Sequence, residues 1–288
     1  MAAGNTSAGS SSGKIQRIIV LVFGVIMCLL LFFADKTNLT NRSESVVGSN
    51  SVSVTNESTG VTNSIPPLAS DPKVDQWIKN LENVSGSEKL TLLDSIILNL
   101  ETRKRFVYAS QYASDALAEN PSEERKKQVG RLSYLATQMD FVQQDSALFQ
   151  RLSEQSIQAL EDVVKVNAQD EEALLYLGLA YTRSRKVENS MNGIMTLRKL
   201  LEINPDNIEG SYQMGLFSMQ TGQFERAIAR FEKVLSLDPN NYPAQLQLAL
   251  AYAESDQPEK AKPLLESLVK SKATPDEKRT ARELLNNL

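Results

Sequence analysis

Gly178-Leu179-Ala180-Tyr181 returns as Gly215-Leu216-Phe217-Ser218 and again as Ala249-Leu250-Ala251-Tyr252, 37 and then 34 residues further along the chain. The turns between these stretches keep the same register, because Pro205 and Pro239 lie 34 residues apart in similar Asn- and Asp-rich surroundings. A period of about 34 residues is typical of helix–turn–helix units that stack on one another. The stretch predicts an all-α solenoid rather than a closed catalytic globule.

The composition argues against catalysis and against nucleic acid as a partner. The chain has no histidine, which removes the commonest general base and metal ligand. Its single cysteine, Cys28, leaves no intrachain disulfide or thiolate zinc site. The sequence contains no phosphate-binding loop or nucleophile elbow, and the net charge is −4. We therefore expect a non-enzymatic protein without catalytic, cofactor-binding or metal-binding residues.

Residues 18–34 form an uncharged apolar run of 17 residues, with basic residues before it and Asp35-Lys36 after it. As a helix this run would be about 26 Å long, at the short end for a hydrocarbon core of about 30 Å. A cleaved signal peptide is less favoured because the end of the run lacks small residues for cleavage. A lipoprotein is less favoured because Met27 precedes Cys28. The sequence predicts an uncleaved single-pass membrane anchor.

The orientation follows from the lengths of the two flanks, since the positive charges at the two ends of the run are nearly balanced. A short polar tail before the anchor and a long body after it favour a signal anchor. We expect the N-terminus in the cytoplasm and the C-terminal domain outside it, in the periplasm of a bacterial cell.

The remaining composition divides the chain into five parts. Of the 28 residues in 37–64, 17 are Ser, Thr or Asn, which is typical of a flexible tether. Helical periodicity begins at Asp71-Pro72, a favourable helix start. The expected parts are a disordered tail (1–17), the anchor (18–34), a Ser/Thr/Asn-rich linker (35–70), a helical region with degenerate repeats (71–170), and regular repeats with a capping helix (171–288).

The regular repeats carry the residues of a known family. Leu174, Leu177, Gly178 and Tyr181 read L-x2-L-G-x2-Y, and Ala227-x3-Phe231 is followed by Pro239. This pattern resembles the tetratricopeptide repeat, in which large residues wedge between two helices and small residues allow their close approach.

Three units match this resemblance, and two upstream stretches match it in part. The units begin at Glu171, Ile208 and Tyr242; the first has three extra residues in the turn between its helices, and Thr274-Pro275 opens a final capping helix. The second unit departs from the pattern at Ser211 and Ser218, where bulky residues are usual. Degenerate units are indicated upstream by Leu93, Ile96, Ala109, Ala113, Ala116 and Pro121, and by Ser156, Leu160 and Val163.

The resemblance implies that the first helix of each unit lines an inner, concave wall. Most positions carried over to this wall are apolar, so we expect a groove that binds an apolar or amphipathic segment. A carboxylate-gripping groove is not expected, because the positions that would carry Lys and Asn are apolar here. The alternative is that upstream helices fold back and fill the groove. The candidate partner-binding residues are Leu175, Leu179, Arg183, Tyr212, Leu216, Met219, Leu246, Leu250 and Glu254.

Two non-enzymatic functions remain open. One is a membrane-tethered scaffold whose groove binds a segment of a protein or peptide partner. The other is an accessory factor or chaperone of protein export or envelope assembly that binds unfolded apolar segments. In layout the chain resembles the single-pass repeat subunit associated with the bacterial Sec translocon. No sequence feature favours one oligomeric state.

Overall fold

The computed structural model describes residue 65 and residues 71–288, except for the side chains of residues 187 and 188. All of these residues belong to one compact unit, Thr59–Leu288. Residues 71–288 form thirteen α-helices and one 3₁₀ turn, with no strand among them. The elements are α2 (Pro72–Asn80), η1 (Leu81–Asn83), α3 (Gly86–Thr102), α4 (Phe106–Glu119), α5 (Glu123–Ala136), α6 (Asp140–Gln144), α7 (Ser146–Val166), α8 (Glu171–Arg183), α9 (Val187–Ile203), α10 (Ile208–Gln220), α11 (Phe224–Leu237), α12 (Tyr242–Glu254), α13 (Pro258–Lys270) and α14 (Pro275–Asn287).

Side-chain caps begin the helices at the positions where the sequence places Asp, Asn or Thr. Asp71 accepts hydrogen bonds from the backbone N–H groups of Lys73 and Val74, which confirms the predicted start of α2. Thr274 and Glu277 form a capping box, which confirms the predicted start of α14. The first helices of the three regular units are confirmed as α8, α10 and α12.

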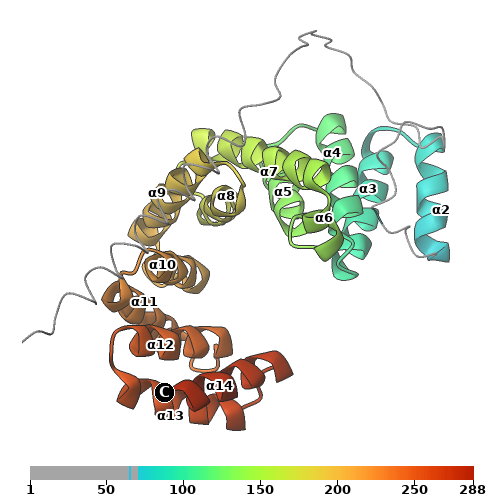
Figure 1. Cartoon of the computed structure of the whole chain (residues 1–288). Helices are drawn as coiled ribbons and strands as arrows, with labels where there is room; N and C mark the ends of the chain where they lie inside the picture. The colour runs from blue at the N-terminus through green and yellow to red at the C-terminus, as the bar shows by residue number, and fades with distance from the viewer. Residues whose placement is uncertain (1–64, 66–70) are drawn as a thin grey trace, which may run out of the picture. The chain divides into compact units, whose positions relative to one another are not determined.

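Successive helices pack in pairs, α8 with α9, α10 with α11, and α12 with α13 (Figure 1). Each first helix also packs on the second helix of the preceding unit, as α8 does on α7 and α12 does on α11. Each unit therefore covers the apolar side of its neighbour, and α14 covers the side of α13 that would otherwise be exposed. This is the α-solenoid that the 34-residue period predicts.

Small residues stand where the two helices of a unit come closest. A Cβ added to Gly178 would lie 2.7 Å from the Leu197 side chain, and one added to Gly215 would lie 2.6 Å from Phe231. The corresponding Ala249 is 1% exposed, and Ala227 is fully buried. These residues are packing residues, as the repeat pattern predicts.

A further unit lies upstream of the regular ones, formed by α5 and α7. Its Gly130 is the eighth residue of α5, as Gly178 and Gly215 are the eighth of α8 and α10. A Cβ at Gly130 would lie 2.4 Å from Leu160, and the Ser156 hydroxyl donates to Gly130 O at 2.7 Å. The short helix α6 is inserted between the two helices, which hides the period in the sequence.

The first regular unit differs from its prediction in one respect. The turn between α8 and α9 occupies residues 184–186, and the next unit has an equally short turn at residues 221–223. The three extra residues instead lengthen α9, which has 17 residues where α11 has 14. Helical hydrogen bonds satisfy these backbone groups, whereas a longer loop would leave them to solvent.

The predicted tail (1–17), anchor (18–34) and nearly all of the linker (35–70) lie outside the described residues. Among the helices of residues 71–288, none combines the length and the apolar character that a membrane span needs.

Candidate partner-binding surfaces

The row of first helices, α8, α10 and α12, carries all of the predicted partner-binding residues; we name it the first-helix face. Leu179 and Leu246 are only 5% and 9% exposed, so they offer a partner little surface. The remaining predicted residues are half-buried or exposed. The half-buried residues are Leu175, Tyr212, Leu216, Met219 and Leu250, and the exposed residues are Arg183 and Glu254.

The C-terminal part of this face is continuous with a hydrophobic cluster. Leu246 belongs to its buried part, and Tyr212, Leu216 and Met219 pack against it. The final helix α14 adds Leu284 and Leu285 to the same cluster. The upstream helices α3, α4 and α5 make their main contacts with one another and with α7 and α8. These contacts do not support the alternative that upstream helices fill the groove.

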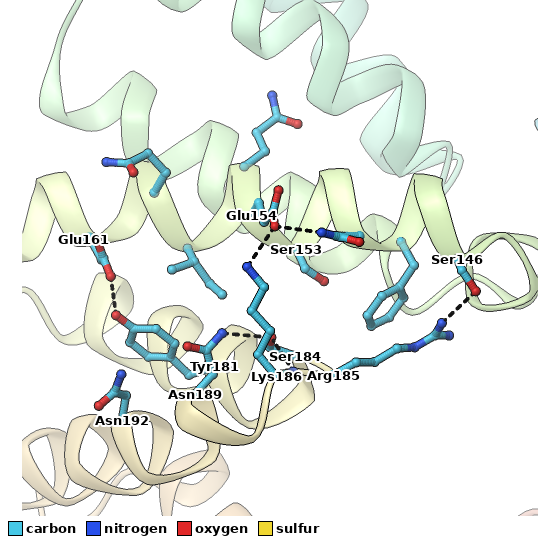
Figure 2. A pocket seen from close by; sticks show the side chains of 15 residues that line it. Ser146, Ser153, Glu154, Glu161, Tyr181, Ser184, Arg185, Lys186, Asn189 and Asn192 are labelled. Atoms are coloured by element: carbon cyan, nitrogen blue, oxygen red, sulfur yellow. Dashed lines mark hydrogen bonds and ion pairs between the residues drawn. The ribbon is translucent and has the colours of Figure 1, made fainter. Parts of the chain in front are cut away.

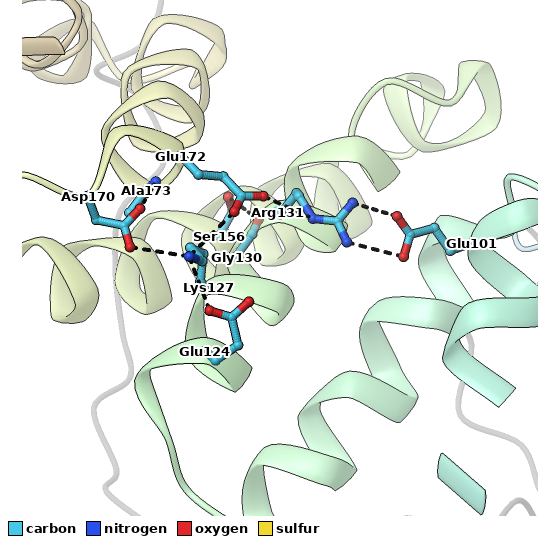
Figure 3. Close-up of polar contacts among 9 residues, drawn as sticks. All are labelled: Glu101, Glu124, Lys127, Gly130, Arg131, Ser156, Asp170, Glu172 and Ala173. Atoms are coloured by element: carbon cyan, nitrogen blue, oxygen red, sulfur yellow. Dashed lines mark hydrogen bonds and ion pairs between the residues drawn. The ribbon is translucent and has the colours of Figure 1, made fainter. Parts of the chain in front are cut away.

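Upstream of α8 the same row is charged rather than apolar (Figure 3). Arg131 on α5 forms a bidentate pair with Glu101 on α3, with N–O distances of 2.5 and 3.1 Å. On its other side its Nε lies 3.6 Å from Glu172 on α8. These side chains connect three successive first helices, so the upstream end of the row is covered by ion pairs.

Lys127 forms the second centre of this charged row. Its Nζ lies 3.1, 3.2 and 3.4 Å from carboxylate oxygens of Glu124, Asp170 and Glu172. Burial lowers the pKa of Lys127, but hydrogen bonds and charges from Glu124 and Asp170 outweigh it and raise the pKa above its usual range. Lys127 therefore stays protonated, and its positive charge is balanced by the three carboxylates around it.

Three tyrosines mark the transition from the charged to the apolar part. The rings of Tyr134 on α5 and Tyr176 on α8 are 5.7 Å apart. Burial raises the pKa of Tyr134 to about 12; Arg183 opposes this shift and Glu209 adds to it. Burial also raises the pKa of Tyr176 and of Tyr212, with Glu209 contributing to both shifts. The exposed Glu209 carboxylate thus lies within electrostatic reach of tyrosines on three helices.

A pocket of about 820 Å³ lies between α7 and α9, away from the first-helix face (Figure 2). Its walls come from α7 between Ser146 and Glu161, from the turn at residues 184–186, and from Tyr181, Asn189 and Asn192. Arg185 lies 4.4 Å from the centre of the Phe149 ring and donates to the Ser146 hydroxyl and to Gln143 O. Lys186 donates to Glu154 at 2.9 Å. These contacts hold α7 and the α8–α9 turn together.

From the sequence we assigned Ser156, Leu160 and Val163 to the second helix of a degenerate unit, which the structure shows as α7, but we did not identify α5 as its first helix, the charged row or this pocket. Gly130 was a usable signal, because Ser156 and Leu160 follow it at helix-pair spacing once the insertion is recognised. The charged row had no such signal, since its pairs between different helices lie 30 to 45 residues apart in the sequence. Within residues 71–288, no group of three or more His, Cys, Asp or Glu side chains could hold a metal ion.

Comparison with sequence families supports the repeat assignment. Residues 143–193 and residues 218–281 each match a model described as a tetratricopeptide repeat. Together the two matches cover less than half of the chain. No curated protein matches the chain in sequence.

Solved structures show the same fold at low sequence identity. TTC0263, a thermophilic TPR protein of Thermus thermophilus, is 17% identical with a TM-score of 0.51, covering 68% of this chain and 99% of that protein. MamA from residue 41 to its end, from Desulfovibrio magneticus RS-1, is 15% identical with a TM-score of 0.50, covering 65% of this chain and 96% of that protein. At these identities the likeness is one of fold alone. The chain contains tetratricopeptide repeats arranged as a helical solenoid.

Proposed function

We propose that this chain is a non-enzymatic, membrane-tethered scaffold that binds a segment of a partner protein along its first-helix face. Tetratricopeptide repeats suggest protein–protein interaction, and a solenoid offers an extended surface for it. The single observation that carries the site is the run of half-buried apolar side chains on successive first helices: Leu175, Tyr212, Leu216 and Leu250.

The upstream charged row supports the placement of the partner on α8, α10 and α12. Lys127 and Arg131 are already paired with carboxylates of the chain, so a partner would have to break those pairs to use them. Tyr212 and Leu216 pack against the neighbouring hydrophobic cluster, but a partner would have no ion pair of theirs to break. Desolvating them would favour an apolar or amphipathic segment by about 25 cal/mol for each Å² buried.

The tether gives the proposal its location in the cell. Residues 18–34 supply a membrane anchor and residues 35–70 a flexible linker, so the solenoid would act beside a membrane, outside the cytoplasm. The second candidate function is an accessory factor or chaperone of protein export or envelope assembly. The apolar character of the face favours this candidate too, because unfolded segments expose apolar side chains.

Photo-crosslinking and a charge substitution together test the site. A crosslinking residue placed at position 216 should capture a partner in native membranes. Leu216→Lys combined with Leu250→Lys should then weaken capture by the full-length chain at least about tenfold, more than about 1.4 kcal/mol, because charge opposes desolvation of the face. Mass spectrometry of the crosslinked species distinguishes one defined partner from many unrelated apolar segments, which would favour the chaperone.

Val166→Lys with Leu237→Lys provides the matched control. Both residues end second helices, are 70% and 36% exposed, and receive the same change of charge. The control variant should capture the partner as strongly as the wild type does. Loss of the partner in both double variants would remove the site from the first-helix face, and loss of helicity in the Leu216/Leu250 variant would show that these leucines are core.

A further inference from the structure

At two of the junctions between repeat units, a tyrosine hydroxyl connects the two helices that meet there. Tyr181 on α8 donates to Glu161 on α7, and Tyr252 on α12 donates to Glu232 on α11, the latter at 2.6 Å. In both pairs the tyrosine follows its glutamate by 20 residues. Each ring fills the junction between a second helix and the following first helix.

The junction between α9 and α10 has neither of these residues. At the same spacing of 20 residues, Arg198 on α9 stands in place of the glutamate and Ser218 on α10 in place of the tyrosine. The Ser218 hydroxyl donates to Met214 O of its own helix at 2.9 Å, and Arg198 is exposed without an ion pair to any described residue. A hollow of about 630 Å³ lies among α9, α10 and α11, and Ser218 lies in its lining.

Basic side chains line this hollow, and no acidic side chain of the described residues does, although the chain has a net charge of −4. The basic residues are Arg198, Arg226, Arg230 and Lys233. Lys233 pairs with Asp206 at 2.6 Å, and Arg226 contacts the Gln223 side chain. Arg198 and Arg230 have no carboxylate partner in the part of the chain that the structure describes.

The rest of the hollow is apolar. Ile194, Met214 and Phe217 form its wall, and Met191, 62% exposed, lies at its edge. An anion alone would leave this apolar wall in water, and an apolar group alone would leave the arginines without partners. The ligand that satisfies both parts carries carboxylates beside an apolar side chain.

We propose that the hollow among α9, α10 and α11 binds an acidic peptide segment that carries an apolar side chain. Its carboxylates pair with Arg198 and Arg230, and its apolar side chain packs against Met214 and Phe217. Arginine suits this role because its planar guanidinium binds carboxylates in a bidentate manner. The hollow shares α10 with the first-helix face, but none of the predicted partner-binding residues lines it, so it is a second binding surface beyond the proposed function.

A peptide segment fits the hollow better than an anionic membrane surface does. Arg230 and Lys233 are half-buried beside the hollow, where a flat array of headgroups does not reach them. A single side chain of a peptide can enter the hollow while its flanking carboxylates remain at the rim. The flexible Met191 side chain can adapt to the shape of that residue.

Fluorescence anisotropy with the purified full-length chain tests the proposal. The probe is the fluorescein-labelled peptide GDELFEDG, and the comparison peptide GDESSEDG lacks the apolar side chains. The chain should bind the probe at least about tenfold more tightly than the comparison peptide. Arg198→Glu with Arg230→Glu should weaken binding of the probe at least about tenfold. Lys262→Glu with Lys270→Glu, an equal change of charge on exposed positions of α13, should leave it unchanged.

A second variant keeps the test decisive if the charge reversals disturb the fold. Ser218→Tyr with Arg198→Glu recreates the tyrosine–glutamate pair of the other junctions, which removes one of the two arginines and should fill part of the hollow with the added ring. We expect this variant to melt at a higher temperature than the wild type and to lose binding of the probe.

Several results would overturn the proposal. They are retained binding in the refilled variant, equal binding of the two peptides, or an equal loss in the α13 control. Binding of phosphatidylglycerol vesicles, but not of the peptide, through Arg198 and Arg230 would assign the hollow to lipid instead. The Leu216→Lys/Leu250→Lys chain should bind the probe as the wild type does, which separates this site from the first-helix face.

Discussion

At the scale of single residues, the spacing between paired helices depends on where a side chain is absent. A Cβ at Gly193 would lie 2.9 Å from the Thr182 backbone nitrogen and 3.0 Å from Gly178 O. Backbone atoms of α8 cannot move aside as a flexible side chain can. The same position in the next unit is Ala227, which is buried without such a restriction. Gly193 therefore allows α8 and α9 to approach more closely than an alanine at this position would.

Gly193→Ala is expected to destabilise the protein by about 1–3 kcal/mol, because the added methyl group forces the two helices apart. In an open helix interior the same substitution would stabilise the protein by roughly 0.5–1 kcal/mol. The sign of the change in stability therefore distinguishes a close approach of the helices from an open position. Urea unfolding of the full-length chain followed by circular dichroism measures this change. The comparison is Ala227→Gly, which should destabilise through lost helix propensity and packing. A Gly193→Ala chain more stable than the wild type would contradict the close approach.

At the scale of elements, the tie between Tyr252 and Glu232 joins α12 to α11. Burial, and then the hydrogen bond to Glu232, raise the pKa of Tyr252 to about 12, whereas an unfolded tyrosine titrates near 10. The unfolded state therefore loses its proton first as the pH rises. The contribution of this group to the free energy of unfolding is complete below about pH 10 and is lost as the pH rises toward about 12.

Tyr252→Phe is expected to lower the free energy of unfolding by about 0.5–1.5 kcal/mol at neutral pH, since it removes one hydrogen bond. The variant also lacks the loss of stability that ionisation causes above about pH 10. The difference between wild type and variant should therefore narrow between about pH 8 and about pH 11. Urea unfolding at the two values measures it, and a difference that widens at high pH would contradict the assigned role.

At the scale of the whole molecule, the first helices present two chemically different surfaces in one row. The part on α3 and α5 is covered by the ion pairs of Arg131 and Lys127, and the part from α8 onward carries the half-buried apolar side chains of Leu175, Tyr212, Leu216 and Leu250. The proposed partner would therefore bind to α8, α10 and α12, which follow the charged part of the row in the sequence. The tether of residues 35–70 would give that end its reach.

Protease added to right-side-out spheroplasts should digest the repeat domain, because the anchor at residues 18–34 is expected to leave it outside the cytoplasm. The full-length chain should remain in the membrane fraction after a high-salt wash. Digestion only after the cells are lysed would reverse the predicted orientation, and release by salt would argue against an anchor.

The repeat and most of its helix boundaries could be predicted without the structure. The caps at Asp71 and Thr274 and the small residues at Gly178, Gly215 and Ala227 act within one helix or between adjacent helices. Such local contacts recur at the period of the repeat and can therefore be read from spacing. Ser218 was also visible in the sequence as a departure from the pattern.

Only the tertiary structure decides which side chains between the units are buried, which form ion pairs and which remain exposed. Leu179 and Leu246 lie in buried positions, and Arg198 and Ser218 line one hollow. Arg131 pairs with Glu101 and Lys127 with Asp170 across helices distant in sequence. The physical reason is that exposure and charge pairing depend on which side chains of neighbouring units meet, and a single repeat period does not contain that information.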